Sequence, residues 1–597
     1  MLRPTARRTT LCAFAALACA VGALAGAQAG QAAGQAAGRL PTLPDAPQAM
    51  VTTQRLLNAA TPDLTGGGAT GGGTGGAAPG DPLAAAAQAQ ASPQALSGAM
   101  RSCALMSVAS SVSGSGASTR VVIKGSTVSF GIGQVPASWW KSPPVSGVTW
   151  QLYFRGLIWV GRIAQGALER NDSAAIDALV RTAAGSVASN PDPGRAVDGW
   201  DEGTNLRRQE SLNCLYRASN GDPRLIPAIT ATAKANLDMS RYYGPPNYPP
   251  HNHGLMANLA LLDAADLLHN ATWKSVAVNR MVNDSRGAFT AGGVSVEQSG
   301  YYHVFNVTVW TDAADLLASY PDRSISAAAP AIRADVARAR AATAFMTDPL
   351  GHLVAWGDGS QKTIGVDPQP ALLFRDDAAG LVTGRWSWTD SRTSYYLFRY
   401  GRGCYGYGHC HDDRGELVWT TLGLPVLIDP GIFTYDAGSF NAFQQTPIGH
   451  NVQMVDRRSP NQAMPVVLRT TKTTGLVHCY TTTDIVYGVS HTRTWRIDQG
   501  VHSVLTTDTV AAPATTTMHF DAGWAYASRS ADGKTLTLTH PSGHVATVRS
   551  STAMRIYQRS ATPVLGWQFP HYSQRIADVQ VLMDAPAGTS TMSVTVS

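Results

Sequence analysis

The spacing of apolar residues divides the chain into two parts with different periodicity. Between about residues 138 and 345, apolar side chains recur every three or four positions, as at Leu255, Leu259 and Leu262. The run Ser173–Val187 has the same spacing, and Pro, Asn and Gly residues separate such runs. In an α-helix this spacing gathers the apolar side chains on one face, so the pattern predicts an all-α domain built from helix pairs.

From about residue 350 onward, the apolar pattern shifts towards a period of two. The segments that alternate, or that are rich in β-branched and aromatic residues, are Leu381–Trp388, Tyr395–Tyr400, Thr492–Ile497 and Thr535–Thr539. Turn-forming Gly, Asn and Asp residues separate them, which predicts an antiparallel β-sandwich. Helices followed by a separate run of strands indicate a multidomain α+β protein rather than a βαβ fold. The predicted boundaries are 138–348 for the helical domain and 349–597 for the β-sandwich domain.

The first 29 residues have the composition of a targeting segment. Three arginines precede the apolar run Leu11–Leu24, and Ala27-Gln28-Ala29 gives an A-x-A cleavage pattern. This predicts a secretory signal peptide over residues 1–29, because a spanning helix needs about 20 apolar residues and this run breaks into Gly, Ala and Gln. We therefore expect export to the periplasm or the extracellular medium, with no stable membrane span.

Two further segments precede the helical domain. Residues 30–98 are rich in Ala, Gly, Gln, Thr and Pro. Such a segment cannot bury enough apolar surface to fold, which predicts a low-complexity linker. Residues 99–137 form a short segment that is expected to be partly strand, for example at Thr119–Lys124.

Charge and cysteine content narrow the classes of function. The formal net charge is +6, from 46 Lys and Arg against 40 Asp and Glu, and there is no dense basic run. Nucleic acid is therefore not an expected partner, and the small positive excess suits either an acidic polymer or an ordinary protein surface. Seven cysteines, of which cleavage after Ala29 would leave five, are too few for a disulfide scaffold but leave room for one bridge.

Four polar segments carry the residue types that catalysis or metal binding requires. They are His251–Gly254, Glu297–His303, His409–Asp413 and His450-Asn451. Histidine and carboxylate are the usual nitrogen and oxygen ligands of zinc. Spacing alone leaves other interpretations open: a helix cap in the first segment, packed aromatic side chains in the second, and ordinary core or surface histidines in the others.

Together, five motifs resemble those of the heparinase II/III-like family of polysaccharide lyases. Asn252-His253-Gly254 resembles the family's N-H-G, and Glu297–His303 resembles its E-Q-S-x-x-Y-H. In the second half of the chain, the H-G-H-x-D, P-L-L-V-D-P-G and S-H-N-T-V-V-V-D motifs of the family are similar to His409-Cys410-His411-Asp412, Leu424–Gly431 and Gly449–Asp456. The resemblance covers roughly residues 138–597.

The resemblance implies a fold and a metal. The fold is an incomplete (α/α) toroid followed by an antiparallel β-sandwich. Zinc would be held by His411, Asp429 and His450 in the sandwich. Its expected role is structural, because it would hold the loop bearing His409 against the toroid.

The resemblance also implies a reaction, β-elimination at a uronate, in which the C5 proton is removed and the C4 oxygen is expelled. Asn252, helped by His253 and Arg207, would neutralise the substrate carboxylate. His253 or His409 would take the C5 proton, and Tyr302 would protonate the leaving oxygen. In a syn geometry, Tyr302 could carry out both proton transfers. These residues would line the cleft between the two domains.

Four positions depart from the family pattern. Cys410 replaces the usual glycine between the two histidines, where it could narrow the turn or add a thiol ligand. Phe433 and Phe443 occupy places where relatives often carry tyrosine, so Tyr435 is the nearest tyrosine and a candidate substrate contact. Gly203 stands where histidine is common.

These patterns predict a secreted polysaccharide lyase that cleaves a uronate-containing acidic polysaccharide and gives unsaturated products. The alternative is a non-catalytic protein on the same fold that binds an acidic glycan or a biofilm matrix. A glycoside hydrolase needs two carboxylates about 5–9.5 Å apart that flank the bond. This reaction is disfavoured because Asp412 and Asp413 are adjacent in the chain and match a segment of the lyase family. A zinc hydrolase is disfavoured because no H-E-x-x-H motif occurs. The motifs indicate neither the polymer nor the oligomeric state.

Overall fold

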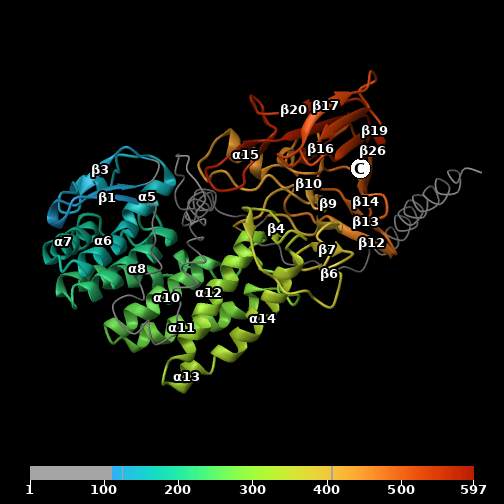
Figure 1. Ribbon diagram of the computed structural model, residues 1–597. Coiled ribbons are helices and arrows are strands. Elements are labelled where there is room, and N and C mark those ends of the chain that lie inside the picture. Colours follow the sequence, from blue (N-terminus) through green and yellow to red (C-terminus); the bar gives the residue numbers. More distant parts are fainter. Residues whose placement is uncertain (1–109, 124–125, 405–407) are drawn as a thin grey trace, which may run out of the picture. The chain divides into compact units, whose positions relative to one another are not determined.

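The computed structural model describes residues 110–123, 126–404 and 408–597 (Figure 1). The predicted signal peptide and the predicted linker lie outside the described residues, so both stay predictions. Within the described part of the chain, no helix is both long and apolar enough to cross a bilayer.

The chain forms two compact units. The helical unit contains the described residues up to Phe289 together with Phe305–Ala337. The β unit contains Thr290–Val304 and Arg338–Ser597. The short segment Thr290–Val304 therefore belongs structurally to the β unit, although its nearest sequence neighbours are helical.

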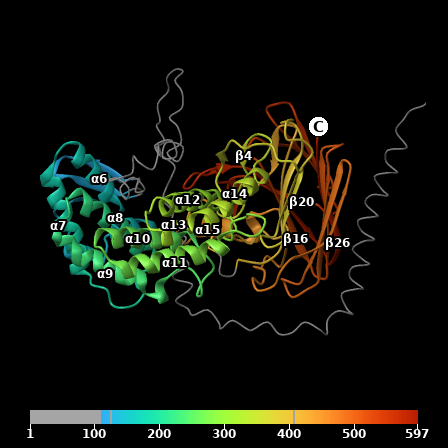
Figure 2. The same ribbon diagram turned by 90° about the horizontal axis from the view of Figure 1, so that it is seen from below.

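The helical unit is built from successive α-helices that follow a small antiparallel sheet (Figures 1 and 2). The sheet has the order β1 (Ser110–Ser113), β2 (Arg120–Ile123) and β3 (Ser129–Gly131). The helices are α5 (Val148–Arg155), α6 (Ile158–Glu169), α7 (Ser173–Ser189), α8 (Glu202–Ala218), α9 (Ile226–Leu237), α10 (Asn252–Leu267), α11 (Ala271–Ala288), α12 (Gly300–Ala318), α13 (Arg323–Ser326) and α14 (Ala329–Phe345). The first residues of α12 and the last residues of α14 belong to the β unit.

Helix α8 carries the predicted site residue Arg207 and is largely buried. It packs against α6, α9 and α10, and most of its residues are buried although many are polar. One of its buried amides is held by a neighbouring helix, since Asn213 Nδ2 donates to the Ala260 carbonyl of α10 (2.9 Å). Asp201 caps the helix by accepting from the Thr204 N–H (2.8 Å), which fixes the first turn that carries Glu202.

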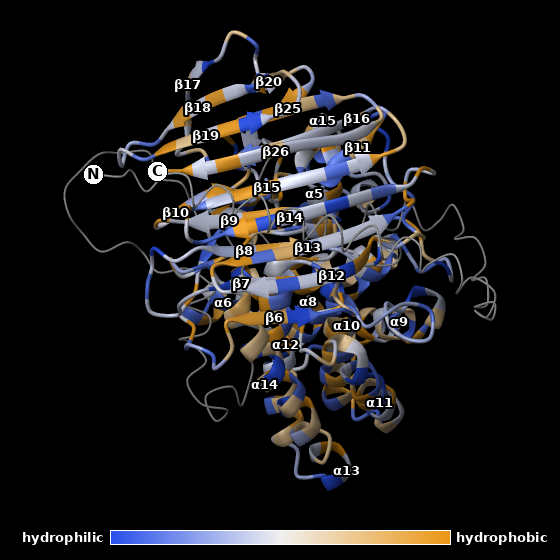
Figure 3. Ribbon diagram, turned by 90° about the vertical axis from the view of Figure 1, so that its right-hand side faces the viewer, coloured by the Kyte–Doolittle hydropathy of each residue, from blue (hydrophilic) through white to orange (hydrophobic). Residues whose placement is uncertain are grey.

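The β unit consists mainly of two antiparallel sheets. One has nine strands in the order β20-β25-β16-β10-β9-β8-β7-β6, with β11 paired to β16, and the other has eight in the order β12-β13-β14-β15-β26-β19-β18-β17 (Figure 3). The strands of the first sheet are β6 (Leu373–Asp376), β7 (Leu381–Arg385), β8 (Tyr395–Arg399), β9 (Leu417–Thr421), β10 (Leu424–Leu427), β11 (Gln453–Val455), β16 (Ala514–Phe520), β20 (Met554–Tyr557) and β25 (Val579–Ala585). Those of the second are β12 (Val467–Thr474), β13 (Val477–Asp484), β14 (His491–Asp498), β15 (Ser503–Val510), β17 (Ala525–Arg529), β18 (Thr535–Thr539), β19 (Val545–Ser550) and β26 (Gly588–Val596). Smaller elements are β4 (His352–Leu353), β5 (Lys362–Thr363), β21 (Ser560–Ala561), β22 (Val564–Leu565), β23 (Trp567–Gln568), β24 (Ile576–Ala577) and α15 (Ser439–Gln445).

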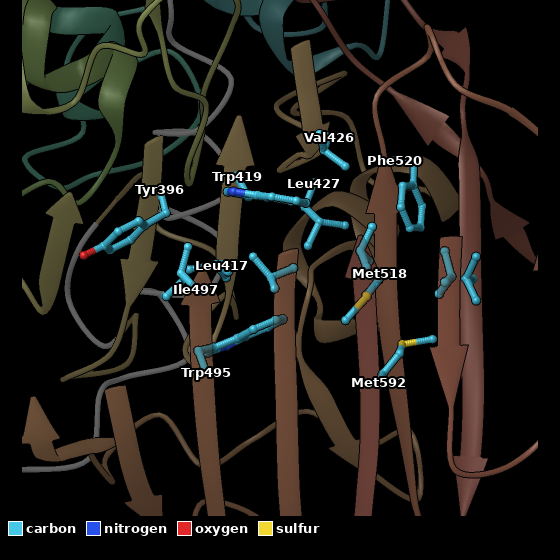
Figure 4. Packing of buried hydrophobic residues seen from close by; sticks show 14 of the residues in the cluster. Tyr396, Leu417, Trp419, Val426, Leu427, Trp495, Ile497, Met518, Phe520 and Met592 are labelled. Carbon is cyan, nitrogen blue, oxygen red and sulfur yellow. The ribbon is translucent and has the colours of Figure 1, made fainter. Parts of the chain in front are cut away.

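Side chains from both large sheets meet in one apolar core (Figure 4). Trp419 and Phe520 come from the nine-stranded sheet, and Trp495 and Met592 come from the eight-stranded sheet. Burial alternates along β14, as the period of two predicts for a strand with one face in a core. The predicted α+β class, with helices followed by an antiparallel sandwich, is confirmed.

The nine-stranded sheet is buried on its other face as well. Every residue of β7, β8 and β9 is buried. Leu381 and Leu397 join a second apolar cluster with Val294 and Met346, which precede the sheet in the chain. This packing ties Thr290–Val304 to the sheet and thereby places the first turn of α12 within the β unit.

Candidate active site and metal centre

Tyr302, His409 and Tyr435 meet at a buried carboxylate, Asp358. Tyr302 lies in the first turn of α12, and the other three lie in segments that connect strands. The hydroxyls of Tyr302 and Tyr435 are 3.1 Å apart, and the Tyr435 hydroxyl donates to Asp358 Oδ2 (3.1 Å). Because a carboxylate only accepts, the Tyr302 hydroxyl in turn donates to the Tyr435 oxygen. The structure thus joins both tyrosines in one hydrogen-bonded chain.

The His409 imidazole is held from two sides. Its Nδ1–H donates to Asp358 Oδ2 (2.8 Å), which assigns the tautomer with the lone pair on Nε2. The ring stacks on that of Tyr302, nearly parallel, with centroids 3.3 Å apart. Nε2 lies 3.4 Å from Glu297 Oε2. His409 can therefore accept a proton at Nε2, beside a carboxylate that would stabilise the resulting positive charge.

Asp358 stands outside every sequence motif, yet it contacts both predicted functional clusters. It lies in a Gly-Asp-Gly turn, and its backbone N–H donates to the His409 carbonyl (2.8 Å). Gly357 has a φ of +60°, and a Cβ there would lie 2.5 Å from the His409 carbonyl oxygen, so the turn requires glycine. Burial raises the pKa of the Asp358 carboxyl, but hydrogen bonds from His409 and His411 more than offset this and hold the pKa below its ordinary value.

His411, Asp429 and His450 converge at one point of the β unit. One nitrogen or oxygen atom of each lies within 4.8 Å of the others, and all three residues are buried. His411 Nε2–H donates to Asp358 Oδ1 (2.9 Å), and His450 Nε2–H donates to the Gln444 carbonyl (3.0 Å). Both imidazoles therefore present a bare Nδ1 to the shared point. In metal sites, a hydrogen bond from the other ring nitrogen commonly orients a histidine ligand in this way.

The atoms that face this point are suited to a metal ion. Among the described residues, none forms a hydrogen bond to His411 Nδ1, His450 Nδ1 or Asp429 Oδ2, and all three atoms are buried. His450 Nδ1 and Asp429 Oδ2 are 3.2 Å apart. Buried polar atoms without partners are costly, and a bound cation would remove that cost. Two imidazole nitrogens and a carboxylate oxygen fit zinc or a similar transition metal.

A second buried carboxylate, Glu416, adjoins the same point. Burial and repulsion from Asp429 raise the pKa of Glu416 above its ordinary value. Burial lowers the pKa of His450, but the negative charges of Glu416 and Asp429 raise it by a larger amount. The net pKa therefore lies well above its ordinary value. The raised pKa values of both groups indicate an excess of negative charge at this buried point.

Cys410, between His409 and His411, is bonded to Cys404 in a disulfide. A thiol is therefore not available at Cys410, and the expectation that it could act as a stray metal ligand is wrong for this oxidised state. The bridge joins Cys404 to the residue that stands between His409 and His411. Cys479, in β13, is a further buried cysteine.

In the helical unit, Asn252 and His253 form the first turn of α10. The helix is capped by His251, whose side chain accepts from the His253 N–H (3.1 Å), so the expected alternative of Asn252 as the cap is not what the structure has. A Cβ at Gly254 would lie 2.0 Å from the Tyr243 carbonyl oxygen, which explains the glycine of the N-H-G motif.

Glu202 and Arg207, both in α8, complete the predicted site residues of the helical unit. His253 Nδ1 lies 2.6 Å from Glu202 Oε1, and both side chains are buried. Burial and the neighbouring Asp201 raise the pKa of Glu202 well above its ordinary value, against a smaller opposing contribution from Arg207. Arg207 Nη1 donates to the Gly203 carbonyl (3.0 Å). Glu202 was not among the site residues predicted from the sequence.

The predicted site residues therefore fall into three groups. Tyr302, His409 and Tyr435 share one cluster of the β unit, and the three predicted zinc ligands share another. The helical unit holds Asn252, His253 and Arg207.

The protein belongs to a class with an α-helical part followed by an antiparallel β-sandwich. The sandwich carries a histidine–tyrosine cluster and a group of two histidines and an aspartate that could hold a metal ion. Residues 375–596 match the sequence model of the family described as Heparinase II/III-like, C-terminal. This part of the chain is similar to that domain family, which confirms the resemblance inferred from the motifs. No curated protein sequence matches the chain.

Solved structures with the same fold include lyases. A heparinase III aligns with a TM-score of 0.62 at 12% identity, over 75% of this chain and 77% of that chain. A heparinase III with methylated lysines gives a TM-score of 0.58 at 12% identity, over 80% of this chain and 82% of that one. A mutant heparan sulfate lyase from Pedobacter heparinus gives 0.54 at 16% identity, over 79% and 80%. The likeness establishes the fold, and the predicted toroid followed by a sandwich is confirmed.

Proposed function

We propose that this protein is an exported polysaccharide lyase that cleaves a uronate-containing acidic polysaccharide by β-elimination. The observation that carries this proposal is the chain of contacts Tyr302–Tyr435–Asp358–His409. It places a proton donor and a proton acceptor side by side on a fold shared with heparinase III and a heparan sulfate lyase. Those relatives are named for uronate-containing polymers, which supports the same substrate class.

The first requirement of the reaction is to make the C5 proton more acidic. The anionic carboxylate on C5 disfavours a second negative charge, so the enzyme must stabilise the enolate that develops there. We assign this task to Asn252, which would donate hydrogen bonds to the carboxylate, helped by His253 and Arg207. The contact with Glu202 would hold the His253 ring in one orientation.

The second requirement is a pair of proton transfers. His409 Nε2 would take the C5 proton, since the Asp358 contact keeps its proton on Nδ1. The electrons of the C5–H bond form the C4–C5 double bond, and the C4–O bond breaks. The Tyr302 hydroxyl would give its proton to the leaving oxygen. Tyr435, hydrogen-bonded to Tyr302, would contact the substrate and hold that hydroxyl in place.

We further propose that His411, Asp429 and His450 hold zinc. The ion would neutralise the buried carboxylate and fix the segment that carries His409 and His411. Its expected role is structural. Oxidising conditions favour the Cys404–Cys410 disulfide, which supports export together with the signal-peptide pattern at the start of the chain.

The test is a panel of uronate polysaccharides incubated with the protein from Gly30 onward, followed by the ultraviolet absorbance of unsaturated products. We expect a rise with at least one polymer and a loss of more than about 100-fold in Tyr302→Phe, because general acid catalysis contributes about 10²–10⁴-fold. Tyr526→Phe, at an exposed position of β17, is the matched control and should keep full turnover. Binding of a polymer without any rise would instead identify a non-catalytic acidic-glycan-binding protein, and full turnover in Tyr302→Phe would refute the role of Tyr302.

A further inference from the structure

We propose that Glu416 is a fourth protein ligand of the metal, so that His411, Glu416, Asp429 and His450 close its coordination shell. This inference rests on the proposed zinc site and adds a ligand that no motif indicates. Glu416 directly precedes β9 and is fully buried, and Asp429 follows β10 in the same hairpin. The two carboxylates are therefore brought together by strand pairing between β9 and β10.

The two oxygens of Glu416 have different surroundings. Oε1 accepts from the backbone N–H of Asn451 (3.0 Å) and from its side-chain Nδ2 (3.2 Å). Oε2 lies 3.4 Å from His450 Nδ1 and forms no hydrogen bond with any described residue. Asn451 thus fixes the carboxylate so that its remaining oxygen points at the atoms that face the proposed metal.

Two of the ligand–ligand distances match those of a tetrahedral shell. Zinc binds histidine nitrogen and carboxylate oxygen at about 2.0–2.2 Å, which puts neighbouring ligand atoms of a tetrahedron about 3.3–3.6 Å apart. His450 Nδ1 lies 3.4 Å from Glu416 Oε2 and 3.2 Å from Asp429 Oδ2. Both separations match two edges of such a tetrahedron within about 0.1 Å, before any ion has drawn the ligands into place.

Glu416 cannot accept a hydrogen bond from His450 once the metal is bound. Zinc would occupy Nδ1 and the Nε2–H of His450 is directed at the Gln444 carbonyl, so neither nitrogen could donate to Glu416. Asp413 is a weaker candidate for the fourth ligand, because its Oδ2 is 3.2 Å from Arg399 Nε in a buried ion pair. Among the described residues, no lysine or arginine forms an ion pair with Glu416, whose neighbour is His450.

Charge leads to the same assignment. With zinc bound, the charges of Glu416 and Asp429 sum with that of the ion to zero, which removes the cost of two uncompensated buried carboxylates. Two nitrogens and two carboxylate oxygens suit zinc, whereas calcium takes six to eight oxygen ligands and magnesium retains several waters. Four protein ligands leave no position for a reactive water, as in structural zinc sites.

The direct test is a crystal structure of the zinc-loaded full chain, with the ion identified by anomalous scattering at the zinc edge. We expect Glu416 Oε2 at about 2.0–2.2 Å from the metal and no water bound to it. A metal on the other three residues, with a water in the fourth position and Glu416 beyond bonding distance, would overturn the inference and leave the proposed zinc site standing. No metal at this point after loading would overturn both.

A solution measurement makes the test independent of crystals. Zinc affinity is determined by competition with a chelator for the wild type, Glu416→Gln and Asp429→Asn, with Glu210→Gln in α8 as a control for the same chemical change. We expect a loss of more than about 100-fold in both site variants, beyond the 10–100-fold typical of an outer-shell partner, and no loss in the control. An affinity of Glu416→Gln within tenfold of the wild type would contradict ligation by Glu416. Should Glu416→Gln fail to fold without metal, Glu416→Asp, which retains the charge but not the reach, replaces it with the same expected loss.

Discussion

Replacing Asp358 by asparagine tests the centre of the proposed mechanism, because one carboxylate holds two histidines. Its Oδ1 accepts from His411 and its Oδ2 accepts from His409 and Tyr435. An amide has the same shape but only one accepting oxygen. If that oxygen faces His409, the NH₂ group meets the Nε2–H of His411, and that ring must move its proton to the nitrogen that faces the metal. If the oxygen faces His411, the His409 ring must move its proton to Nε2 and can no longer act as the base.

The magnitude follows from the bonds that are lost. Hydrogen bonds to a charged group contribute about 1.5–3 kcal/mol each, and at least one of the three must be lost, so we expect Asp358→Asn to lower the free energy of unfolding by about 2–5 kcal/mol. A misplaced proton on His409 removes general base catalysis, which is a loss of about 10²–10⁴-fold in turnover. A misplaced proton on His411 weakens zinc binding by about 10–100-fold.

Both quantities can be measured on one variant. Turnover is followed by ultraviolet absorbance at saturating zinc, and zinc affinity by chelator competition. Asp367→Asn, at an exposed position of the β unit, is the matched control. Turnover and zinc affinity that both stay within about threefold of the wild type in Asp358→Asn would refute the reasoning, since either orientation of the amide must damage one of them.

Two further predictions concern stability. Removal of zinc should lower the melting temperature by about 8 °C together with activity, because a ligand at 1,000 times its Kd contributes about 4 kcal/mol. An unchanged melting temperature after complete removal would contradict a structural metal. Asp484 and Asp508 raise the pKa of buried His491 to about 9, although burial lowers it. Since the folded pKa exceeds the ordinary 6.5, about 3 kcal/mol of stability should be present below pH 6.5 and lost as the pH rises through 9. Denaturant unfolding at pH 6 and 9.5 checks this, and His491→Gln should lack the difference.

The apolar periodicity predicted the two parts of the fold because most helices and strands have one face in a core. It did not mark α8, in which buried polar residues interrupt the apolar spacing. Their partners, such as the Ala260 carbonyl for Asn213, come from other helices, and no local pattern records them. The assignment of Thr290–Val304 to the β unit also depends on tertiary packing alone.

The candidate site was predictable only where motifs preserve it. His411, Asp429 and His450 are distant in sequence and meet because β10 pairs with β9 and both β10 and β11 pair with β16, so spacing could not select them without the family resemblance. Asp358 and Glu416 belong to no quoted motif, and carboxylates are common in any chain. What distinguishes them is complete burial among histidines, a property that exists only in the folded structure.

A metal without an open coordination position could still influence elimination, because Asp358 contacts both a proposed metal ligand, His411, and the proposed base, His409. Zinc on Nδ1 of His411 would keep the proton of that ring on Nε2, where Asp358 Oδ1 accepts it. With Oδ1 occupied in this way, Asp358 stays oriented so that Oδ2 receives the Nδ1–H of His409 and the lone pair of His409 remains on Nε2. Loss of zinc would free the His411 proton to move to Nδ1 and so loosen Asp358, which would then leave His409 with a mixed population of tautomers. The metal would thereby act on the base through one carboxylate, and zinc removal should reduce turnover without abolishing binding of the polymer.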